Sequence, residues 1–268
     1  MTAAQQTASS RLAPYAGRAR LEVKQFFRQR DAVIFTFGLP ILIYALYGVT
    51  MTGTLTLGGQ TVDHDTYMLP GLAAAAILLT SFQATTLSVA ADRATGGLKR
   101  CQTTPMPASA FVVGKVALVL VSSLAQIVLL LLTARIFFDV AGPLSWGRFA
   151  AIYFLGCSAG TTCGVAIGWA LPNPKGATTV VPALTLAMQF ICGVFFIFSA
   201  LPTWLQLFAQ TLPLTWLARG MRAAFLPEPL AAAERGGSWE FPLTMLILAA
   251  WAVAGGLLAM RSARWRYV

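Results

Sequence analysis

The residues that could carry chemistry in this chain of 268 residues begin with a serine between glycines. Gly156-Cys-Ser-Ala-Gly160 matches the pattern that presents a nucleophilic serine on a sharp turn. Such a serine needs a base within hydrogen-bond reach, and nothing brings the single histidine, His64, toward it. Gly156, Gly160, Gly164 and Gly168 recur at every fourth residue, which gives a helix one smooth face for a close neighbour. We therefore predict helix packing at these glycines and no catalytic residue.

Two other patterns have the residue types of a metal site or a nucleotide site. Asp63-His64-Asp65 offers metal ligands, but three adjacent residues in a loop make a poor cage. Gly114-Lys115 resembles the end of a phosphate-binding loop, yet Ser109 replaces its first glycine and Val116 replaces the residue that would bind magnesium. The cysteines have neither metal-ligand nor disulfide spacing: Cys101, Cys157, Cys163 and Cys192. We expect no metal and no cofactor in this chain, so ATP and magnesium would be bound by another polypeptide.

Polar side chains inside apolar segments are the remaining candidates. Ser81, Thr85 and Ser88 share one helix face, whereas Gln83 and Thr86 point nearly the opposite way. A helix that is polar on two sides should be surrounded by protein or water rather than lipid. Hydrogen bonding between helices and a substrate path explain these residues equally well, and the candidates for a path are Ser81, Gln83, Thr85, Thr86, Ser88, Gln126 and Gln189.

The composition then indicates which elements must position these residues. Hydrophobic residues make up 57% of the chain and charged residues 10%, too few to cover a soluble fold. The charges are bunched and leave apolar runs of about 20 residues, the length of a transmembrane helix. The net charge of +10 does not indicate nucleic-acid binding, because the basic residues flank these runs. We predict an all-α membrane protein with six transmembrane helices at residues 32–52, 68–91, 110–138, 149–171, 177–199 and 241–261.

The segments around these helices have patterns of their own. Residues 1–10 are polar, and we predict that they are disordered. Residues 11–31 have apolar residues at a helical period with cations between them, which favours an amphipathic helix in the membrane interface. Packing on another protein surface is the alternative. Residues 32–268 then form the transmembrane domain. Within it, residues 199–225 are apolar but broken by prolines, so we predict a re-entrant helical hairpin on the outer side, with a pair lying flat as the alternative.

The basic residues predict the orientation. With the N-terminus inside, 14 of the 19 lysines and arginines lie on the cytoplasmic side and 5 on the outer side. The outer group is Arg135, Arg148, Arg219, Arg222 and Arg235. We therefore expect both termini in the cytoplasm. Because arginine exceeds lysine, as in proteins from GC-rich bacteria, we place the protein in a bacterial cytoplasmic membrane.

The segment between the second and third predicted spans carries a resemblance to a known family. Asp92-Arg-Ala-Thr-Gly-Gly-Leu-Lys-Arg-Cys-Gln-Thr-Thr-Pro105, followed by Gly114-Lys115, resembles the cytoplasmic loop of ABC-2 type transporter permeases. Ala94 and Lys99 depart from that pattern, because the family prefers acidic residues there, and Gly97 replaces a threonine. Leu212-Pro-Leu-Thr-Trp-Leu-Ala-Arg-Gly-Met-Arg222 is similar to the family's segment before the last span.

The resemblance implies the permease subunit of an ATP-driven exporter. Such a subunit dimerises with a second permease copy or a paralogue and docks two copies of a cytoplasmic ATP-binding subunit. Loop 92–109 would be the coupling element, and the residues that would contact the ATPase are Asp92, Arg93, Gly96, Gly97, Leu98, Lys99 and Arg100.

The small permeases of this family that the chain resembles serve exporters of drugs, polyketides and lipids. We therefore expect a hydrophobic or amphiphilic solute. A polysaccharide or glycolipid exporter is the alternative. An ATP-independent channel or carrier is disfavoured because no acidic residue lies within a span, and an intramembrane enzyme because the serine has no base.

Overall fold

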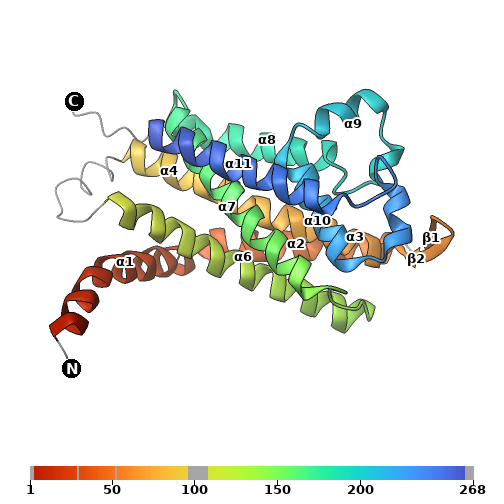
Figure 1. The fold of residues 1–268 in the computed structure, drawn as a ribbon, viewed down its shortest axis with the longest axis horizontal. Coiled ribbons are helices and arrows are strands. Elements are labelled where there is room, and N and C mark those ends of the chain that lie inside the picture. The colour runs from red at the N-terminus through yellow and green to blue at the C-terminus, as the bar shows by residue number, and fades with distance from the viewer. Residues whose placement is uncertain (1–2, 29, 52, 96–107, 263–268) are drawn as a thin grey trace.

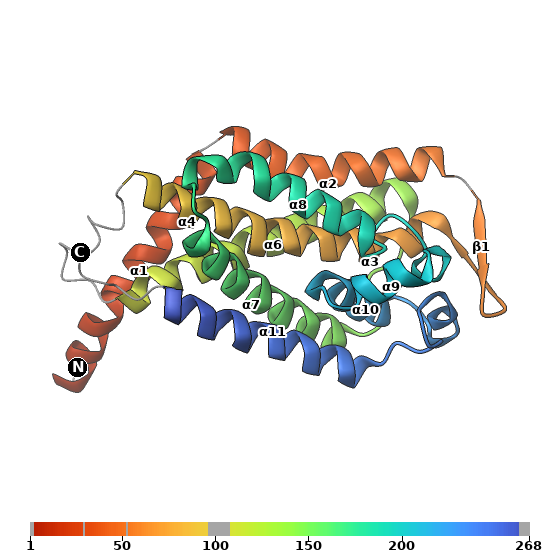
Figure 2. The ribbon, with the colours of Figure 1, turned by 90° about the horizontal axis from the view of Figure 1, so that it is seen from above.

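A computed structural model describes residues 3–28, 30–51, 53–95 and 108–262. Long helices run side by side along the longest axis of the molecule (Figures 1 and 2). One end of the bundle, the α1 end, holds α1 and the last turns of α4 and α11. The opposite end, the hairpin end, holds two short strands together with α9 and α10.

The second predicted span is the central helix of the bundle. It runs through α3 (His64–Leu78), a π-helical turn η1 (Leu79–Gln83) and α4 (Ala84–Ala94). Every residue from Tyr67 to Leu78 is buried, and four consecutive alanines in this stretch allow neighbouring helices to approach. The sequence predicted residues 68–91, so the helix is longer than expected at both ends.

Three further predicted spans coincide with long apolar helices. They are α6 (Ala108–Phe138), α7 (Trp146–Ala170) and α11 (Phe241–Ser262). Together with the central helix they are the four helices of the described chain that are long and apolar enough to cross a membrane. In the first predicted span, 32–52, α2 (Arg30–Thr50) is present as a helix of 21 residues. The prediction of six full-length spans is thus supported in part.

The fifth predicted span, 177–199, was too long. A 3-10 turn η2 (Pro174–Gly176) leads into α8 (Ala177–Ile191), which has 15 residues and is therefore about 22 Å long. The helix ends because Gly193 adopts a left-handed backbone conformation with φ of +69°. The N–H of Val194 then bonds back to the carbonyl of Gln189 at 3.2 Å. The sequence marks this helix end only by one glycine inside an apolar run, and a hydropathy average does not detect a single glycine.

The predicted re-entrant segment, 199–225, is a pair of short helices. After η3 (Phe198–Ala200) come α9 (Thr203–Ala209) and α10 (Pro213–Phe225), and η4 (Glu228–Ala233) leads toward α11. Each residue of α10 from Leu214 on is buried, and this helix packs against α3, α7 and α11. The helical pair therefore agrees with the sequence, while its depth in the bilayer stays a prediction.

A β-hairpin lies where the sequence suggested only an outer loop. β1 (Thr54–Leu57) pairs antiparallel with β2 (Gln60–Asp63). Gly58 and Gly59 form the turn with φ of +56° and +78°, the conformation that two-residue hairpin turns favour. The signal was the alternation Thr-Leu-Thr-Leu before a Gly-Gly pair. The sequence analysis did not predict this hairpin, but the described chain is otherwise built of helices and agrees with the predicted all-α class.

The N-terminal helix is longer than predicted and is attached to the bundle. α1 (Ala3–Arg28) begins inside residues 1–10, which we expected to be disordered. Ala and Gln dominate that start, and both have high helix propensity. α1 packs along α6. A position in the membrane interface stays a prediction, but one face of this helix contacts protein.

Candidate functional site

A cluster of charged side chains joins three helices at the α1 end, and we call it the Lys115 cluster. Lys115 on α6 is only 2% exposed. Its Nζ lies 3.1 Å from Glu22 Oε2 on α1 and 3.1 Å from Asp92 Oδ2 on α4. It also donates to the Ser88 hydroxyl, and Arg18 pairs with Glu22 from within α1. Two cations and two carboxylates thus balance, as buried charges must.

The local sequence explains why this cluster forms. A Cβ placed at Gly114 would lie 2.8 Å from the Cγ of Arg18 and 3.3 Å from the Cγ of Glu22. Glycine therefore lets α1 approach α6 closely, and the next residue supplies the cation that meets Glu22. The Gly114-Lys115 pair, which resembled part of a phosphate-binding loop, joins two helices in this structure.

Arg93 binds the end of α7. Its Nη1 donates to the carbonyls of Gly168 and Leu171, both at 2.8 Å, and its guanidinium lies 5.9 Å from the ring of Trp169. These carbonyls end a helix, where the partial charge is negative and a cation is favourable. We expected Asp92 and Arg93 in a loop facing a partner, but both lie in the last turn of α4 and bond within the chain.

The remaining predicted coupling residues lie outside the described residues. They are Gly96, Gly97, Leu98, Lys99 and Arg100. Their contact with an ATPase stays a prediction. What the structure adds is their attachment point, since the turn of α4 that precedes them is bonded to α6 through Asp92 and to α7 through Arg93. The same Lys115 that meets Asp92 also meets Glu22 on α1.

The polar residues of the spans are distributed over several helix contacts. Ser81 and Thr86 donate to carbonyls of their own helix, at 2.6 Å and 2.7 Å. Gln83 accepts a hydrogen bond from Thr185 on α8. The amide of Gln126 donates to the Thr36 carbonyl at 2.5 Å and thereby joins α6 to α2.

The other three candidates lie close to these contacts. The Gln189 amide reaches the Thr185 carbonyl at 3.4 Å, within α8. Thr85 and Ser88 line a small cavity beside Lys115, with a volume of about 20 Å³. The structure therefore brings Thr85 and Ser88 together at the Lys115 cluster. Gln83 and Gln189 both bond to Thr185, and Gln126 lies in a separate contact with α2.

The four glycines of α7 lie against the central helix and α10. A Cβ at Gly164 would be 2.8 Å from the Phe82 carbonyl oxygen, and one at Gly168 would be 2.8 Å from Val89 Cβ. Gly156 faces Leu217, and Gly160 faces Ser81. The hydroxyl of Ser158, between the first two glycines, donates to the Phe154 carbonyl at 2.7 Å.

A second charged cluster, at the hairpin end, was missed by the sequence analysis. Arg219 and Arg222 on α10 are each 1% exposed, and Glu234 is 3% exposed. Arg222 Nη1 lies 2.7 Å from one Glu234 oxygen, and Arg219 Nε lies 3.4 Å from the other. Arg219 also pairs with Glu240, and Arg222 donates to the Gly193 carbonyl. We call this the Glu234 cluster. The available signal was two arginines three residues apart in an apolar helix, followed by glutamates.

Aromatic rings complete this cluster. The Arg219 guanidinium lies 4.9 Å from the Trp216 ring, and that of Arg222 lies 5.3 Å from the Tyr67 ring. Such contacts stabilise a cation that has been removed from water. The two arginines therefore hold α10 to the central helix, to the turn after α8 and to the segment before α11.

Comparison with known proteins agrees with this arrangement. No curated protein sequence matches the chain significantly. The profile of the family described as ABC-2 type transporter matches residues 19–226, which include the last part of α1 and all of α2 to α10. Because that match covers most of the chain, the protein belongs to the ABC-2 type transporter family.

Proposed function

We propose that the chain is the permease subunit of an ATP-driven exporter that moves a hydrophobic or amphiphilic solute out of the cytoplasm or the inner leaflet. ATP would be hydrolysed by a separate cytoplasmic subunit, present in two copies, and the permease would pair with a second copy or a paralogue. The α1 end would face the cytoplasm, as the distribution of basic residues predicts.

The observation that carries this proposal is the attachment of the last turn of α4. Asp92 meets Lys115 on α6, Lys115 meets Glu22 on α1, and Arg93 binds two carbonyls at the end of α7. A displacement of the loop that follows would therefore act on several helices together. Coupling between distant sites needs such a connected element.

The interior favours an apolar solute over a polysaccharide. Most of the polar candidates in the described spans form hydrogen bonds within one helix or between helices, which leaves few groups for sugar hydroxyls. A sugar site needs several convergent polar groups. The apolar side chains that dominate the buried core suit a hydrocarbon instead.

The test uses the loop cations and a matched control. The tagged chain is purified from its native membrane in mild detergent, and ATP-binding subunits are identified by mass spectrometry. Lys99→Glu with Arg100→Glu should release the ATPase subunit or abolish its solute-stimulated hydrolysis, because charge-assisted hydrogen bonds to a partner would be lost. Arg93 is left unchanged, since its substitution would disturb α7.

Lys175→Glu is the control, because Lys175 is exposed in the turn between α7 and α8. It should leave both readouts unchanged. Absence of any ATP-binding subunit in the purified complex would contradict the exporter assignment. A subunit that stays bound and fully stimulated in the double variant would contradict coupling through this loop.

A further inference from the structure

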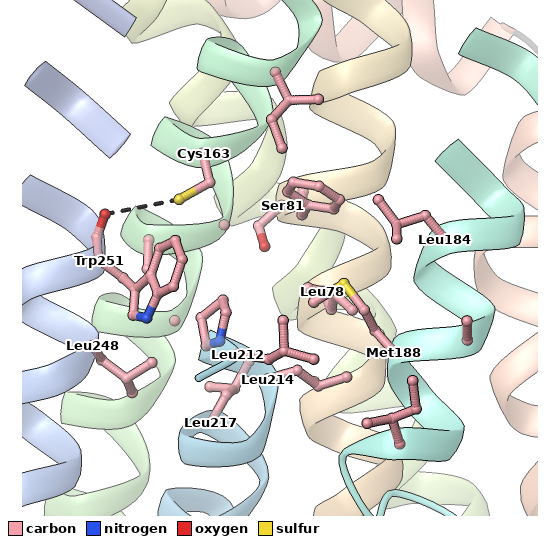
Figure 3. Close-up of a pocket in the computed structure, with 18 of the residues that line it drawn as sticks. Leu78, Ser81, Cys163, Leu184, Met188, Leu212, Leu214, Leu217, Leu248 and Trp251 are labelled. Atoms are coloured by element: carbon pink, nitrogen blue, oxygen red, sulfur yellow. Dashed lines mark hydrogen bonds between the residues drawn. The ribbon is translucent and has the colours of Figure 1, made fainter. Parts of the chain in front are cut away.

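A cavity of about 310 Å³ lies inside the bundle beside the π-helical turn. Its walls come from the central helix, α7, α8, α9, α10 and α11. Side chains from several of these elements converge on it in Figure 3. Its volume falls in the range of about 300–1,000 Å³ that is typical of ligand pockets. An apolar cavity of roughly half this size stays dry and binds benzene.

The lining of this cavity is almost wholly apolar. Its polar side chains already have partners, because the Ser81 hydroxyl donates to the Ile77 carbonyl at 2.6 Å. The Cys163 thiol points to the Trp251 carbonyl, with sulfur and oxygen 3.8 Å apart (Figure 3). Among the residues that the structure describes, none of those that line the cavity is charged. An ion, a sugar or a charged head group would therefore lose its water without gaining polar partners in the lining. A hydrocarbon needs no polar partners, so it can enter the cavity without this cost.

The cavity has a closed interior and an open rim. On the inside, Leu214 is fully buried and Leu248 is 1% exposed. At the rim, Leu184 on α8 is 45% exposed and Phe208 on α9 is 53% exposed. Exposed large apolar side chains on a protein that belongs to a membrane family face the hydrocarbon of the bilayer. An apolar rim of this kind suits contact with hydrocarbon better than contact with water.

We propose that this cavity binds the hydrocarbon part of an amphiphile, which enters sideways from the bilayer past Leu184 and Phe208. The site lies within one chain, so that each permease copy would carry its own. The proposal deepens the proposed function, since it gives the exported class a place to bind, but a bilayer lipid has the same hydrocarbon chemistry.

The shape of the site argues for an inserted chain over a covering surface. Six elements of one chain enclose it, and in Figure 3 Leu248 lies on the side opposite Leu184, with Leu214 and Leu217 between them. A second copy of the protein could cover the rim, but a helix backbone is too wide to fill the interior. A hydrocarbon chain or a small ring is narrow enough to do so.

Photochemical labelling in lipid nanodiscs tests this proposal without an ATPase. One sample carries phosphatidylcholine with a diazirine in the middle of an acyl chain, and the other carries a free long-chain fatty alcohol with a diazirine. After illumination, adducts are mapped by mass spectrometry. We expect adducts on the buried residues Leu248 and Met188 in addition to Leu186, which is 53% exposed and does not line the cavity.

Two matched variants show whether the adducts report the cavity. Ala187→Phe places a ring in its lining, whereas Ala183→Phe places the same ring one turn earlier on α8, at an exposed position outside the lining. Both positions are exposed, so both variants should fold. Ala187→Phe should lower the labelling of Leu248 severalfold and leave Leu186 unchanged, and Ala183→Phe should change neither.

The outcomes separate the sources of the ligand. Labelling by both probes supports a site that accepts hydrocarbon whatever its head group. Labelling by phosphatidylcholine alone supports a resident lipid, and labelling by the alcohol alone supports a small solute. Labelling of Leu186 without Leu248 or Met188, or equal labelling of Leu248 in both variants, would overturn the proposal. That result would not contradict the exporter assignment, because the exporter assignment is tested separately by the purification of an ATP-binding subunit with the permease.

Discussion

The Lys115 cluster joins side chains from three helices that are distant in the sequence, whereas the Glu234 cluster draws its ion pairs from one short stretch of chain. Lys115 lies 93 residues from Glu22, while Arg222 lies 12 residues from Glu234. Both clusters contain two cations and two carboxylates. They differ in the cation, because lysine is a compact point charge and arginine a planar group that binds several acceptors at once.

This difference suggests different mechanical roles. Asp92 in the Lys115 cluster has a side chain that is 29% exposed, so water can replace its partner when α4 moves. In the Glu234 cluster, the Glu240 side chain is 39% exposed, but those of Arg219, Arg222 and Glu234 are each 1% exposed, and Arg222 also holds a backbone carbonyl. The first cluster suits a joint that changes during transport, and the second suits a fixed anchor for α10.

The comparison requires that the two clusters lie on opposite sides of the membrane. In a variant without the native cysteines, a cysteine at Asp63 should react with an impermeant maleimide added to intact cells, since Asp63 ends β2 at the hairpin end. A cysteine at Gln102 should react only after permeabilisation. This is an all-or-none result, and the reverse pattern would place the Lys115 cluster outside.

The largest expected loss of stability is at Glu234. Glu234→Gln removes the carboxylate between two buried arginines, and an uncompensated buried charge costs about 3–5 kcal/mol. We expect a low yield of monodisperse protein and a much lower melting temperature in detergent. Glu228→Gln, at the exposed start of the short helix η4 that precedes Glu234, should behave as the wild type. Equal stability of both variants would mean that the cluster is no anchor.

Substitution at Lys115 should have a smaller effect. Lys115→Met leaves Glu22 paired with Arg18 and Asp92 partly solvated, so we expect a loss of about 1–3 kcal/mol in the free energy of unfolding, measured by SDS titration. Adding Glu22→Gln should restore part of this loss, because it removes the buried carboxylate. Arg135→Met is the control, as that cation is exposed near the opposite end of α6. Strictly additive effects of the two substitutions would argue against a direct interaction.

The smallest effect is expected at Arg93. Arg93→Gln removes a cation from the carbonyl end of α7, where such a charge contributes about 1 kcal/mol. The melting temperature should fall by a few degrees while the protein stays folded. Lys175→Gln, in the exposed turn that follows α7, is the control variant and should leave the melting temperature unchanged. If Arg93→Gln lowered the stability more than Lys115→Met does, the contact of Arg93 with α7 would be the stronger of the two, contrary to this prediction.

The sequence predicted the long apolar helices well, because a hydropathy average uses only residues that are adjacent in the sequence and needs no knowledge of the fold. α6, α7 and α11 begin and end within a few residues of the predicted spans. The spacing of the α7 glycines likewise predicted a close contact, and the central helix lies against them. Features that depend on backbone conformation were harder. The end of α8 at Gly193 and the hairpin turn at Gly58 both require positive φ, which leaves no trace in hydropathy.

The ionic clusters could not be predicted because their partners are set by the fold. Arg219 and Arg222 were counted among the outer cations, and only the packing of α10 shows that they are buried. Arg93 was expected to contact a partner because its segment resembles the family's cytoplasmic loop, and its internal acceptors were not foreseen. Its acceptors are backbone carbonyls more than 70 residues away, at Gly168 and Leu171. A backbone carbonyl has no signature of its own in a sequence.

The π-helical turn from Leu79 to Gln83 gives the central helix one residue more than a regular α-helix would hold. One residue corresponds to about 100° of rotation, so the faces of α3 and α4 are out of phase. A helical wheel drawn through the whole span assumes a regular α-helix, so it misplaces the residues of α4 relative to those of α3 by this rotation. The two halves can therefore meet different partners, Arg222 through Tyr67 on α3 and Lys115 through Ser88 on α4, without a break in the helix.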